Sequence, residues 1–273
     1  MEYRNKNATI FYETIGRGRP IVMVHGFTLD HRSLKIATEP IFKKISGWKR
    51  IYLDLPGMGK SKAPLVKNAD EMLEVILQFI DAIIPGQTFA IIGNSYGGYI
   101  ARGIVHSIQS QVKGLCLLCP VVFAESQKRT VPQLSVKERD DRFMHQLKSK
   151  DKAEFESIAV IQNRESWFRY QKQIMPGMRA HDVQFCARLS KEGYGFSFDP
   201  DKLDKPFNKP VLVLAGKQDH IVGYQDAWTL QGAYPQMSYA TLDHAGHNLE
   251  IEQTSVFRVL TTEWLGRVSS HET

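Results

Sequence analysis

The sequence of 273 residues contains only three cysteines. An odd and sparse set cannot form the disulfide framework that holds small secreted proteins together, and it fits a reducing compartment. Cys116 and Cys119 lie three residues apart inside a predicted strand, so their side chains point to opposite faces of that strand. This spacing excludes a metal or redox pair, and no zinc-binding or phosphate-binding motif is present. We therefore expect neither a metal nor a cofactor.

Long apolar runs are also absent. No window approaches about eighteen apolar residues, the length that a transmembrane helix requires. The first residues, MEYRNKNATIFYE, carry charges at once and no apolar run, unlike a secretory leader. These absences predict a cytoplasmic protein that does not associate with membranes.

Charge of a single sign does not dominate the chain. Lys and Arg total 35 and Asp and Glu total 29, a formal net charge of +6. With 42% apolar and 23% charged residues, the composition is that of a globular rather than a disordered chain. Residues 128–152 hold eight basic and four acidic residues, so much of the excess is local. No pattern of interleaved aromatics or nucleic-acid motif accompanies them. We expect a small-molecule substrate rather than a nucleic acid as the partner, and a monomer or homodimer.

Short apolar runs alternate with longer segments of helical periodicity. We expect strands at residues 8–15, 20–24, 49–55, 88–92, 112–119, 210–215 and 237–242, and helices at 70–84, 96–108, 224–231 and 254–266. Strands that alternate with helices build a parallel sheet with helices on both of its faces. The predicted fold class is therefore α/β.

The alternation stops between residues 121 and 205. This segment is richer in charge and in long polar residues, and it shows no strand–helix alternation. We predict that 121–205 is an inserted helical cap. The two segments on either side of it, 1–120 and 206–273, would then form one α/β core.

A nucleophile motif lies where the pattern changes from strand to helix. Residues 93–98 read GNSYGG and place Ser95 between Gly93 and Gly97, with the strand TFAII before them and a helical segment after them. A serine on such a turn projects its hydroxyl from the end of the sheet, and the glycines let the backbone crowd there. The alternative is a glycine-rich turn with a capping serine. The flanking strand and helix favour the nucleophile.

A serine hydroxyl needs a base to take its proton and a carboxylate to orient that base. Of the histidines after Ser95, only His244 and His247 lie in a glycine-containing loop after a late strand, TLDHAGHN. We favour His247, because Gly246 before it permits a turn that aims the ring at the edge of the sheet. His220 is the strongest rival for a role in the site.

The carboxylate should follow a strand. Asp219 comes after the strand PVLVLA, whereas Asp243 is better explained as a loop cap and Asp54 precedes the serine in the chain. The oxyanion of the reaction also needs fixed N–H donors, and the backbone of Tyr96, directly after the serine, is predicted to supply one. The backbone of Phe27, in the loop HGFTLD after the strand PIVMV, is predicted to supply the other.

Five motifs, in their order along the chain, resemble those of the α/β-hydrolase fold family. They are HGF at 25–27, DLPGMGKS at 54–61, GNSYGGY at 93–99, GKQD at 216–219 and GH at 246–247. The resemblance implies a mostly parallel sheet of about eight strands with a helical cap over the site. It also implies a nucleophile elbow at Ser95, with Asp219 as the acid and His247 as the base. Many relatives carry a proline where Gly223 stands here, so the loop after Asp219 departs from the family pattern.

The serine at the elbow narrows the possible activities within the family. It argues against haloalkane dehalogenases and epoxide hydrolases, because these use an aspartate at the elbow. The classes that remain are carboxylesterases, lipases, thioesterases, acyltransferases, some aminopeptidases, cofactor-free haloperoxidase-like proteins and carbon–carbon bond hydrolases. The GNS start resembles the carbon–carbon bond hydrolases of meta-cleavage products, but those usually carry a tryptophan just after the histidine, where Asn248 and Leu249 stand here. The resemblance implies a serine esterase that acts on a small carboxylic ester through a Ser-His-Asp triad. A carbon–carbon bond hydrolase and a non-catalytic ligand receptor are the alternatives.

Aromatic and methionine side chains gather in the predicted cap. Trp167, Phe168, Met175 and Met178, together with His220 beside the acid, are predicted to line the substrate pocket. Rigid aromatics and flexible methionines adapt to acyl groups. The alternative is that the cap residues form the cap's own core.

Overall fold

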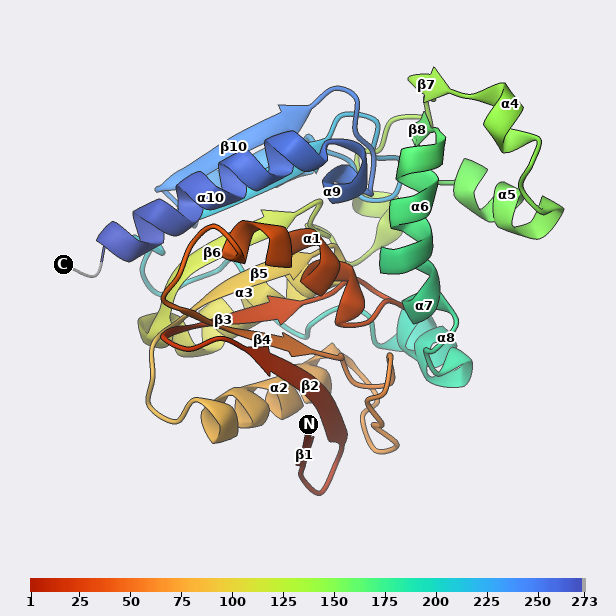
Figure 1. The fold of residues 1–273 in the computed structure, drawn as a ribbon. Helices are drawn as coiled ribbons and strands as arrows, with labels where there is room; N and C mark the ends of the chain where they lie inside the picture. The colour runs from red at the N-terminus through yellow and green to blue at the C-terminus, as the bar shows by residue number, and fades with distance from the viewer. Residues whose placement is uncertain (272–273) are drawn as a thin grey trace.

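An eight-stranded sheet runs through the centre of the molecule, which the computed structural model describes for residues 1–271 (Figure 1). In spatial order the strands are β1 (Glu2–Arg4), β2 (Thr9–Ile15), β4 (Trp48–Leu53), β3 (Arg19–Val24), β5 (Phe89–Asn94), β6 (Val112–Leu118), β9 (Val211–Gly216) and β10 (Met237–Leu242). The β1–β2 and β2–β4 pairs are antiparallel and the other neighbours are parallel. The predicted mostly parallel sheet is confirmed. Residues 272–273 of the predicted core lie outside the described residues.

Helices cover both faces of the sheet, as predicted. Helices α1 (Arg32–Phe42) and α10 (Thr254–Ser270) lie on one face, and α2 (Ala69–Ile83) and α3 (Tyr96–Ile108) lie on the other (Figure 1). Helix α2 is capped by Asn68, whose side chain accepts a hydrogen bond from the Glu71 N–H. Among residues 1–271, no helix combines the length and the apolar character that crossing a bilayer requires.

Most elements lie close to the bounds expected from the sequence, and three differences have local causes. The segment expected to be helical at 224–231 is a 3₁₀ turn, η3 (Asp226–Gly232). Strand β1 and helix α1 were not expected from the sequence. Strand β1 is only three residues long and α1 contains Pro40, so neither shows the periodicity from which strands and helices are predicted.

Short helices fill the stretch between β6 and β9, where the cap is predicted; "the cap" below means residues 121–205. They are α4 (Asp141–Met144), α5 (Ser149–Glu156), α6 (Arg164–Gln173), α7 (Met175–Met178) and α8 (Val183–Glu192), with the two short strands β7 (Glu138–Arg139) and β8 (Ile161–Gln162). Figure 1 shows α6, α7 and α8 beside the end of the sheet toward which β3 points. Phe155, Trp167 and Tyr170 pack into a cluster separate from the core of the sheet.

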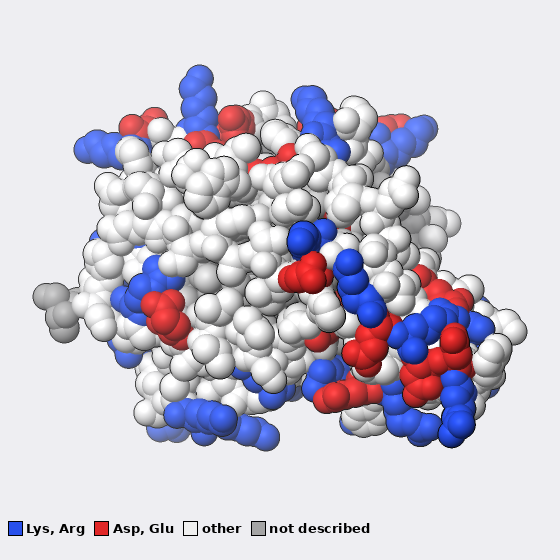
Figure 2. Space-filling model, turned by 90° about the horizontal axis from the view of Figure 1, so that it is seen from above, with Lys and Arg blue, Asp and Glu red and all other residues white. Residues whose placement is uncertain are grey.

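Charges of both signs are interspersed on the cap. Arg139 pairs with Asp141 and Glu156, and Lys152 also lies near Glu156. Figure 2 shows blue and red side chains mixed together on the side of the molecule where these helices lie. The local excess of basic residues is therefore partly neutralised within the cap itself.

A buried arginine on α3 holds both ends of the cap. The Arg102 side chain is fully buried and forms an ion pair with Asp201, near the end of the cap. It also donates hydrogen bonds to the carbonyl oxygens of Val121 (2.7 Å) and Val122 (2.8 Å), at the start of the cap. The Tyr234 hydroxyl donates to the same Asp201 carboxylate at 3.1 Å. One charged side chain thus joins the two connections between cap and core.

Replacing Arg102 with leucine should lower the free energy of unfolding by about 3 kcal/mol or more, because the largely buried Asp201 carboxylate loses its cation. Urea unfolding followed by tryptophan fluorescence measures the change. Lys128→Leu is the control, since its ion pair with Glu125 is exposed and should contribute less than about 1 kcal/mol. Equal losses in the two variants would contradict the assigned role of Arg102.

Candidate active site

Ser95 lies on a sharp turn between β5 and α3. Its φ of 53° and ψ of −118° form a combination that residues other than glycine adopt only under strain. The Ser95 N–H donates to the Leu118 carbonyl oxygen at 2.9 Å, which ties the turn to the neighbouring strand. A Cβ on Gly93 would lie 2.6 Å from the carbonyl oxygen of Gly97, and one on Gly97 would lie 2.1 Å from that of Val24. Both glycines are therefore required for close backbone packing around the serine.

Ser95, His247 and Asp219 come from three separate segments and form one hydrogen-bonded chain. His247 Nε2 lies 2.9 Å from Ser95 Oγ, and His247 Nδ1 lies 2.8 Å from Asp219 Oδ2. Asp219 is fully buried, and its Oδ1 accepts hydrogen bonds from the N–H groups of Ile221 (2.9 Å) and Val222 (3.0 Å). Because the Asp219 carboxylate can only accept a hydrogen bond, the neutral imidazole of His247 carries its proton on Nδ1. Its Nε2 lone pair is then directed at the Ser95 hydroxyl.

Asp219 also sets the basicity of His247. Burial disfavours the charged imidazolium, but the charge and the hydrogen bond of Asp219 outweigh burial and raise the pKa of His247 above its usual value. The charge of Glu250 adds to the rise of this pKa, and that of Arg129 opposes it. The raised pKa makes the imidazole a stronger proton acceptor.

The two N–H groups predicted to hold an oxyanion flank Ser95. Tyr96 is the first residue of α3, where an N–H has no acceptor within the helix. Phe27 follows Gly26, and a Cβ on Gly26 would lie 3.3 Å from the Ser95 Cβ, so this loop runs directly against the serine. Within residues 1–271, neither backbone N–H donates to another protein oxygen. Both donors are therefore available to a bound molecule.

The HGF and DLPGMGKS motifs hold the loop after β3 in place. His25 is buried, burial lowers its pKa, and its Nε2 accepts a hydrogen bond from the Leu55 N–H at 2.9 Å. Asp54 is buried as well, and one of its oxygens accepts from the backbone N–H and from Nδ1 of His31, both at 2.7 Å. Its other oxygen accepts from the Lys60 N–H at 2.8 Å. These contacts join the loop after β3 to the loop after β4, a structural role.

A family model described as the alpha/beta hydrolase fold matches residues 19–254 of the chain. The chain belongs to the α/β-hydrolase fold family. A solved structure, an alpha/beta superfamily hydrolase from Oenococcus oeni PSU-1, is 31% identical to this hydrolase. The match covers 98% of this chain and 99% of that chain, with a TM-score of 0.89.

Two further relatives carry more specific names. A monoacylglycerol lipase of Homo sapiens is 24% identical over 92% of this chain and 78% of its own length. The 2-hydroxy-6-oxo-6-(2'-aminophenyl)hexa-2,4-dienoic acid hydrolase of Metapseudomonas resinovorans is 23% identical over 94% of this chain and 87% of its own length. The family therefore shows that this protein is a hydrolase, and it leaves the substrate class open.

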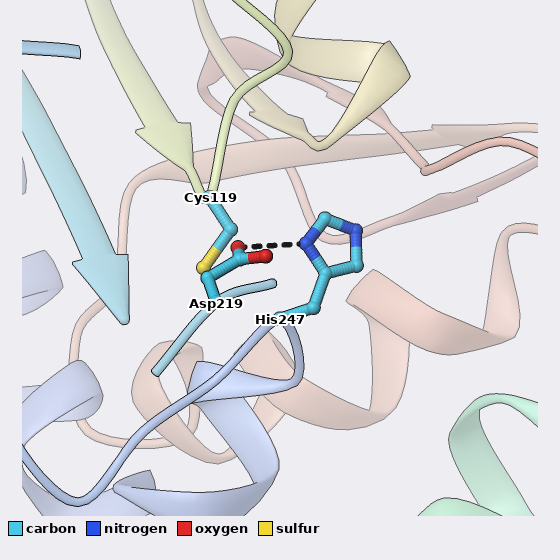
Figure 3. A group of neighbouring side chains, drawn as sticks. All are labelled: Cys119, Asp219 and His247. Carbon is cyan, nitrogen blue, oxygen red and sulfur yellow. Dashed lines mark hydrogen bonds and ion pairs between the residues drawn. The ribbon is translucent and has the colours of Figure 1, made fainter. Parts of the chain in front are cut away.

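Cys119 lies beside the Asp219–His247 pair of this hydrolase (Figure 3). The strand was expected to include residue 119, but β6 ends at Leu118 and Cys119 has a φ of 41°, so its thiol donates to the Gly246 carbonyl oxygen at 3.5 Å. The ligand atoms of Cys119, Asp219 and His247 lie within 4.8 Å of one another, close enough to surround a metal ion. Burial and the charge of Asp219 raise the pKa of the thiol well above its usual value, which disfavours the thiolate that a metal needs.

A cavity of about 170 Å³ opens onto Ser95 and His247. Its core side is lined by Gly26, Phe27, Thr28, Leu29, Asn94 and Asn248, and its cap side by Glu154, Ser157, Ile158, Tyr170, Ile174 and Met178. The cap therefore forms one wall of the site, and the reactive side chains form part of the other.

The predicted pocket residues are mostly placed elsewhere. Met178 lines the cavity, but Trp167 and Met175 are buried in the core of the cap. Phe168 is 55% exposed, and the Lys172 ammonium lies 4.1 Å from its ring centroid. None of these three residues lines the cavity, because composition identifies the apolar side chains of α6 and α7 and not the faces that turn toward the cavity. Tyr170 occupies that face of α6 instead.

His220 was also predicted to line the pocket, and it does not line the cavity. Burial lowers its pKa, the charge of Asp219 opposes the shift, and the nearby His247 adds to it. Within residues 1–271, its buried Nδ1 has no hydrogen-bond partner. His220 is therefore a neutral ring in the loop of the acid rather than a wall of the cavity.

A larger hollow of about 1000 Å³ adjoins the cavity at Phe27, which lines both spaces. It runs between residues 122–129 and 190–201, at the two ends of the cap. The Phe27 ring packs edge-on against Tyr96 and Tyr194, so it is held in place between the two spaces.

Glu252 joins the histidine loop to the cap, and sequence reasoning missed it. One of its carboxylate oxygens accepts from the Gly246 N–H at 2.6 Å, directly before His247, and the other accepts from the Val160 N–H of the cap at 2.6 Å. Burial raises the pKa of Glu252 to about 7, against the effect of these donors. A Cβ on Gly246 would lie 2.7 Å from a methyl of Val160, so the two segments touch. No sequence spacing identifies a residue of this kind, because the two backbone N–H groups that it binds lie far apart in the chain.

Gly223 stands where many family members carry a proline. Its φ is 75°, whereas proline is restricted to about −65°. A Cβ at this position would lie 2.1 Å from the carbonyl oxygen of Thr130 in the cap. The Gly223 N–H donates to the Asp219 carbonyl at 3.1 Å. Glycine stands in place of proline here because the left-handed backbone excludes proline, and because the absence of a side chain lets the Asp219 loop pack against the cap.

Replacing Gly223 with alanine should lower the free energy of unfolding by about 1–3 kcal/mol, because it adds left-handed strain and a clash with Thr130. Calorimetry measures the change. Gly232→Ala is the matched control: no heavy atom lies within 4 Å of its Cβ position, and we expect a change within about 0.5 kcal/mol. A Gly223 variant as stable as the Gly232 variant would refute this account of the loop.

Proposed function

We propose that this protein is a serine hydrolase of small carboxylic esters, with Ser95 as nucleophile, His247 as general base and Asp219 as the acid that orients the base. The observation that carries the proposal is the hydrogen-bonded chain through both nitrogens of His247, with distances of 2.9 Å to Ser95 and 2.8 Å to Asp219. The unused N–H groups of Phe27 and Tyr96 beside the serine support it. So does the relative named as a lipase, since lipases cleave esters.

The reaction would proceed through an acyl-enzyme. Ser95 Oγ attacks the ester carbonyl carbon while His247 Nε2 takes the hydroxyl proton, and the N–H groups of Phe27 and Tyr96 stabilise the oxyanion. The carbonyl then re-forms as the bond to the alcohol oxygen breaks, and His247 gives its proton to the departing alcohol. Water attacks the acyl carbon as His247 takes its proton. The acid leaves when Ser95 Oγ departs and regains that proton from His247.

The cavity favours a small substrate. A volume of about 170 Å³ equals the share of roughly five or six water molecules in the liquid. One portion of the ester, acyl or alcohol, would occupy this space between Ser95 and the cap. The other portion would extend past Phe27 into the larger hollow.

A carbon–carbon bond hydrolase would use the same serine and histidine, and one relative bears the name of a dienoic acid hydrolase. Such a substrate carries a carboxylate. Among the described residues that line the cavity there is no Lys or Arg to bind it, so we place the ester first. A non-catalytic receptor would differ in reactivity, because a fluorophosphonate labels only an activated serine.

Replacing Ser95 with alanine should lower kcat/KM for p-nitrophenyl butyrate by about 10³-fold or more, because the acyl-enzyme cannot form. The same change should abolish labelling by a fluorophosphonate probe. Ser107→Ala is the control on the same helix, since the Ser107 hydroxyl donates to the Gly103 carbonyl oxygen away from the site, and it should keep both properties. Undiminished hydrolysis by the Ser95 variant would sink the proposal.

The pH profile tests the role of His247, whose neutral form is the base. Because the pKa of His247 is raised, the acid limb of kcat/KM should have its midpoint above about 6.5. Asp219→Asn removes the charge that raises this pKa, so the limb of the residual activity should move to lower pH, and kcat should fall by about 10³- to 10⁴-fold. Asp243→Asn, an exposed carboxylate near the same loop, should change neither. A limb that stays in place in the Asp219 variant argues against this pairing.

A further inference from the structure

One acidic side chain lines the cavity at the proposed nucleophile. Glu154, on α5, is the only Asp or Glu among the described residues that line this space, and no Lys or Arg accompanies it. Of its cap-side neighbours, Ile158, Ile174 and Met178 are apolar, whereas Ser157 and Tyr170 carry hydroxyls. A charged side chain on the wall of a small cavity requires an explanation, because a substrate that displaces water from the cavity removes part of its solvation.

The Glu154 carboxylate has a single polar partner within residues 1–271. Glu154 Oε1 accepts a hydrogen bond from the Tyr170 hydroxyl at 3.2 Å, and the side chain forms no ion pair there. Burial and the charge of Glu154 together raise the pKa of Tyr170, so its hydroxyl stays protonated and keeps donating. Glu156, two residues further along the same helix, is neutralised by Arg139. Glu154 thus keeps acceptor capacity and a negative charge that the protein does not use.

The proposed reaction uses neither Glu154 nor Tyr170. Both belong to the cap, whereas the reactive groups belong to the core, and the two sets face the same cavity of about 170 Å³. A substrate group that reaches Glu154 therefore lies only a few bonds from the carbonyl at Ser95. A carboxylate there repels an anionic group and accepts a hydrogen bond from a hydroxyl or an ammonium.

We propose that Glu154, supported by Tyr170, is a specificity residue that selects esters with a hydrogen-bond donor, a hydroxyl or an ammonium, close to the scissile carbonyl and rejects esters with a carboxylate there. This inference rests on the proposed ester hydrolysis and names the class of ester. It also accounts for a charged side chain beside the apolar residues of the cap wall.

The test compares butyrate esters that differ in one group of the alcohol. These are the ethyl, 2-hydroxyethyl, 2-(dimethylamino)ethyl and carboxymethyl esters, which present at neutral pH no polar group, a hydroxyl, an ammonium and a carboxylate. We expect kcat/KM of the wild-type protein for the hydroxyl and ammonium esters to exceed that for the ethyl ester by about tenfold, since a hydrogen bond to a charged group has about that effect. The carboxymethyl ester should be the slowest.

Two substitutions separate charge from hydrogen bonding. Glu154→Gln keeps an acceptor oxygen, so it should abolish the preference for the ammonium ester and the discrimination against the carboxymethyl ester while keeping part of the preference for the hydroxyl. Glu154→Leu should abolish the preference for the ammonium ester, the preference for the hydroxyl ester and the discrimination against the carboxymethyl ester. Glu156→Gln is the matched control on the same helix, outside the cavity, and should leave every ratio unchanged. Each ratio is taken against ethyl butyrate measured on the same variant, so a general change in activity cancels.

The donor can also be placed in the acid portion, by comparing ethyl 3-hydroxybutyrate with ethyl butyrate. The series whose ratio responds to Glu154→Gln identifies the portion that occupies the cavity, and a response in either series supports the inference. Ratios that Glu154→Gln leaves unchanged in both series would overturn it, while cleavage of ethyl butyrate that depends on Ser95 would leave the proposed function intact. If no ester is cleaved, the proposed function fails, and this inference fails with it.

Discussion

A carboxylate can be buried only when hydrogen-bond donors replace the water that it loses. Asp219 is fully buried and has three such donors: the N–H groups of Ile221 and Val222 in its own loop, and Nδ1 of His247 from another loop. The third donor has consequences beyond solvation. It places the ring proton on Nδ1, turns Nε2 toward Ser95 and raises the pKa of the imidazole. The position, tautomer and basicity of His247 therefore all follow from the requirement to satisfy one buried charge.

The parallel sheet brings these groups together. Phe27, Ser95 and Asp219 follow β3, β5 and β9, and His247 follows β10. Parallel neighbours end at the same edge, so residues as far apart in the chain as Ser95 and His247 meet there. The strained backbone at Ser95 can persist because its N–H is bonded to the neighbouring strand and because glycines remove every Cβ that would obstruct the turn.

The cap is joined to this edge at several points, each of which touches a loop of the site. Arg102 binds the carbonyls where the cap begins, Glu252 links the histidine loop to Val160, and Gly223 packs against Thr130. The placement of the cap is thus coupled to the placement of Asp219 and His247. The same placement puts Glu154 on the wall of the cavity that Ser95 also lines.

The sheet, its helices and the residues that meet at Ser95 could be predicted because their causes are local. A buried strand needs a run of apolar residues, and a tight turn needs glycine, so Gly93, Gly97 and Gly246 marked the turns that carry Ser95 and His247. Helix α1 was not predicted, because Pro40 interrupts the local pattern from which a helix is recognised.

The lining of the cavity has no local cause. Both faces of α6 carry aromatic rings, and packing against other elements alone decides that Tyr170 faces the cavity while Phe168 faces solvent and Trp167 fills the cap. Glu252 and Cys119 form hydrogen bonds with backbone groups of distant segments, and such contacts leave no recognisable spacing in the sequence. The chemistry of this hydrolase is therefore readable from short-range backbone requirements, whereas the shape and charge of the space around Ser95 arise only when cap and core pack together.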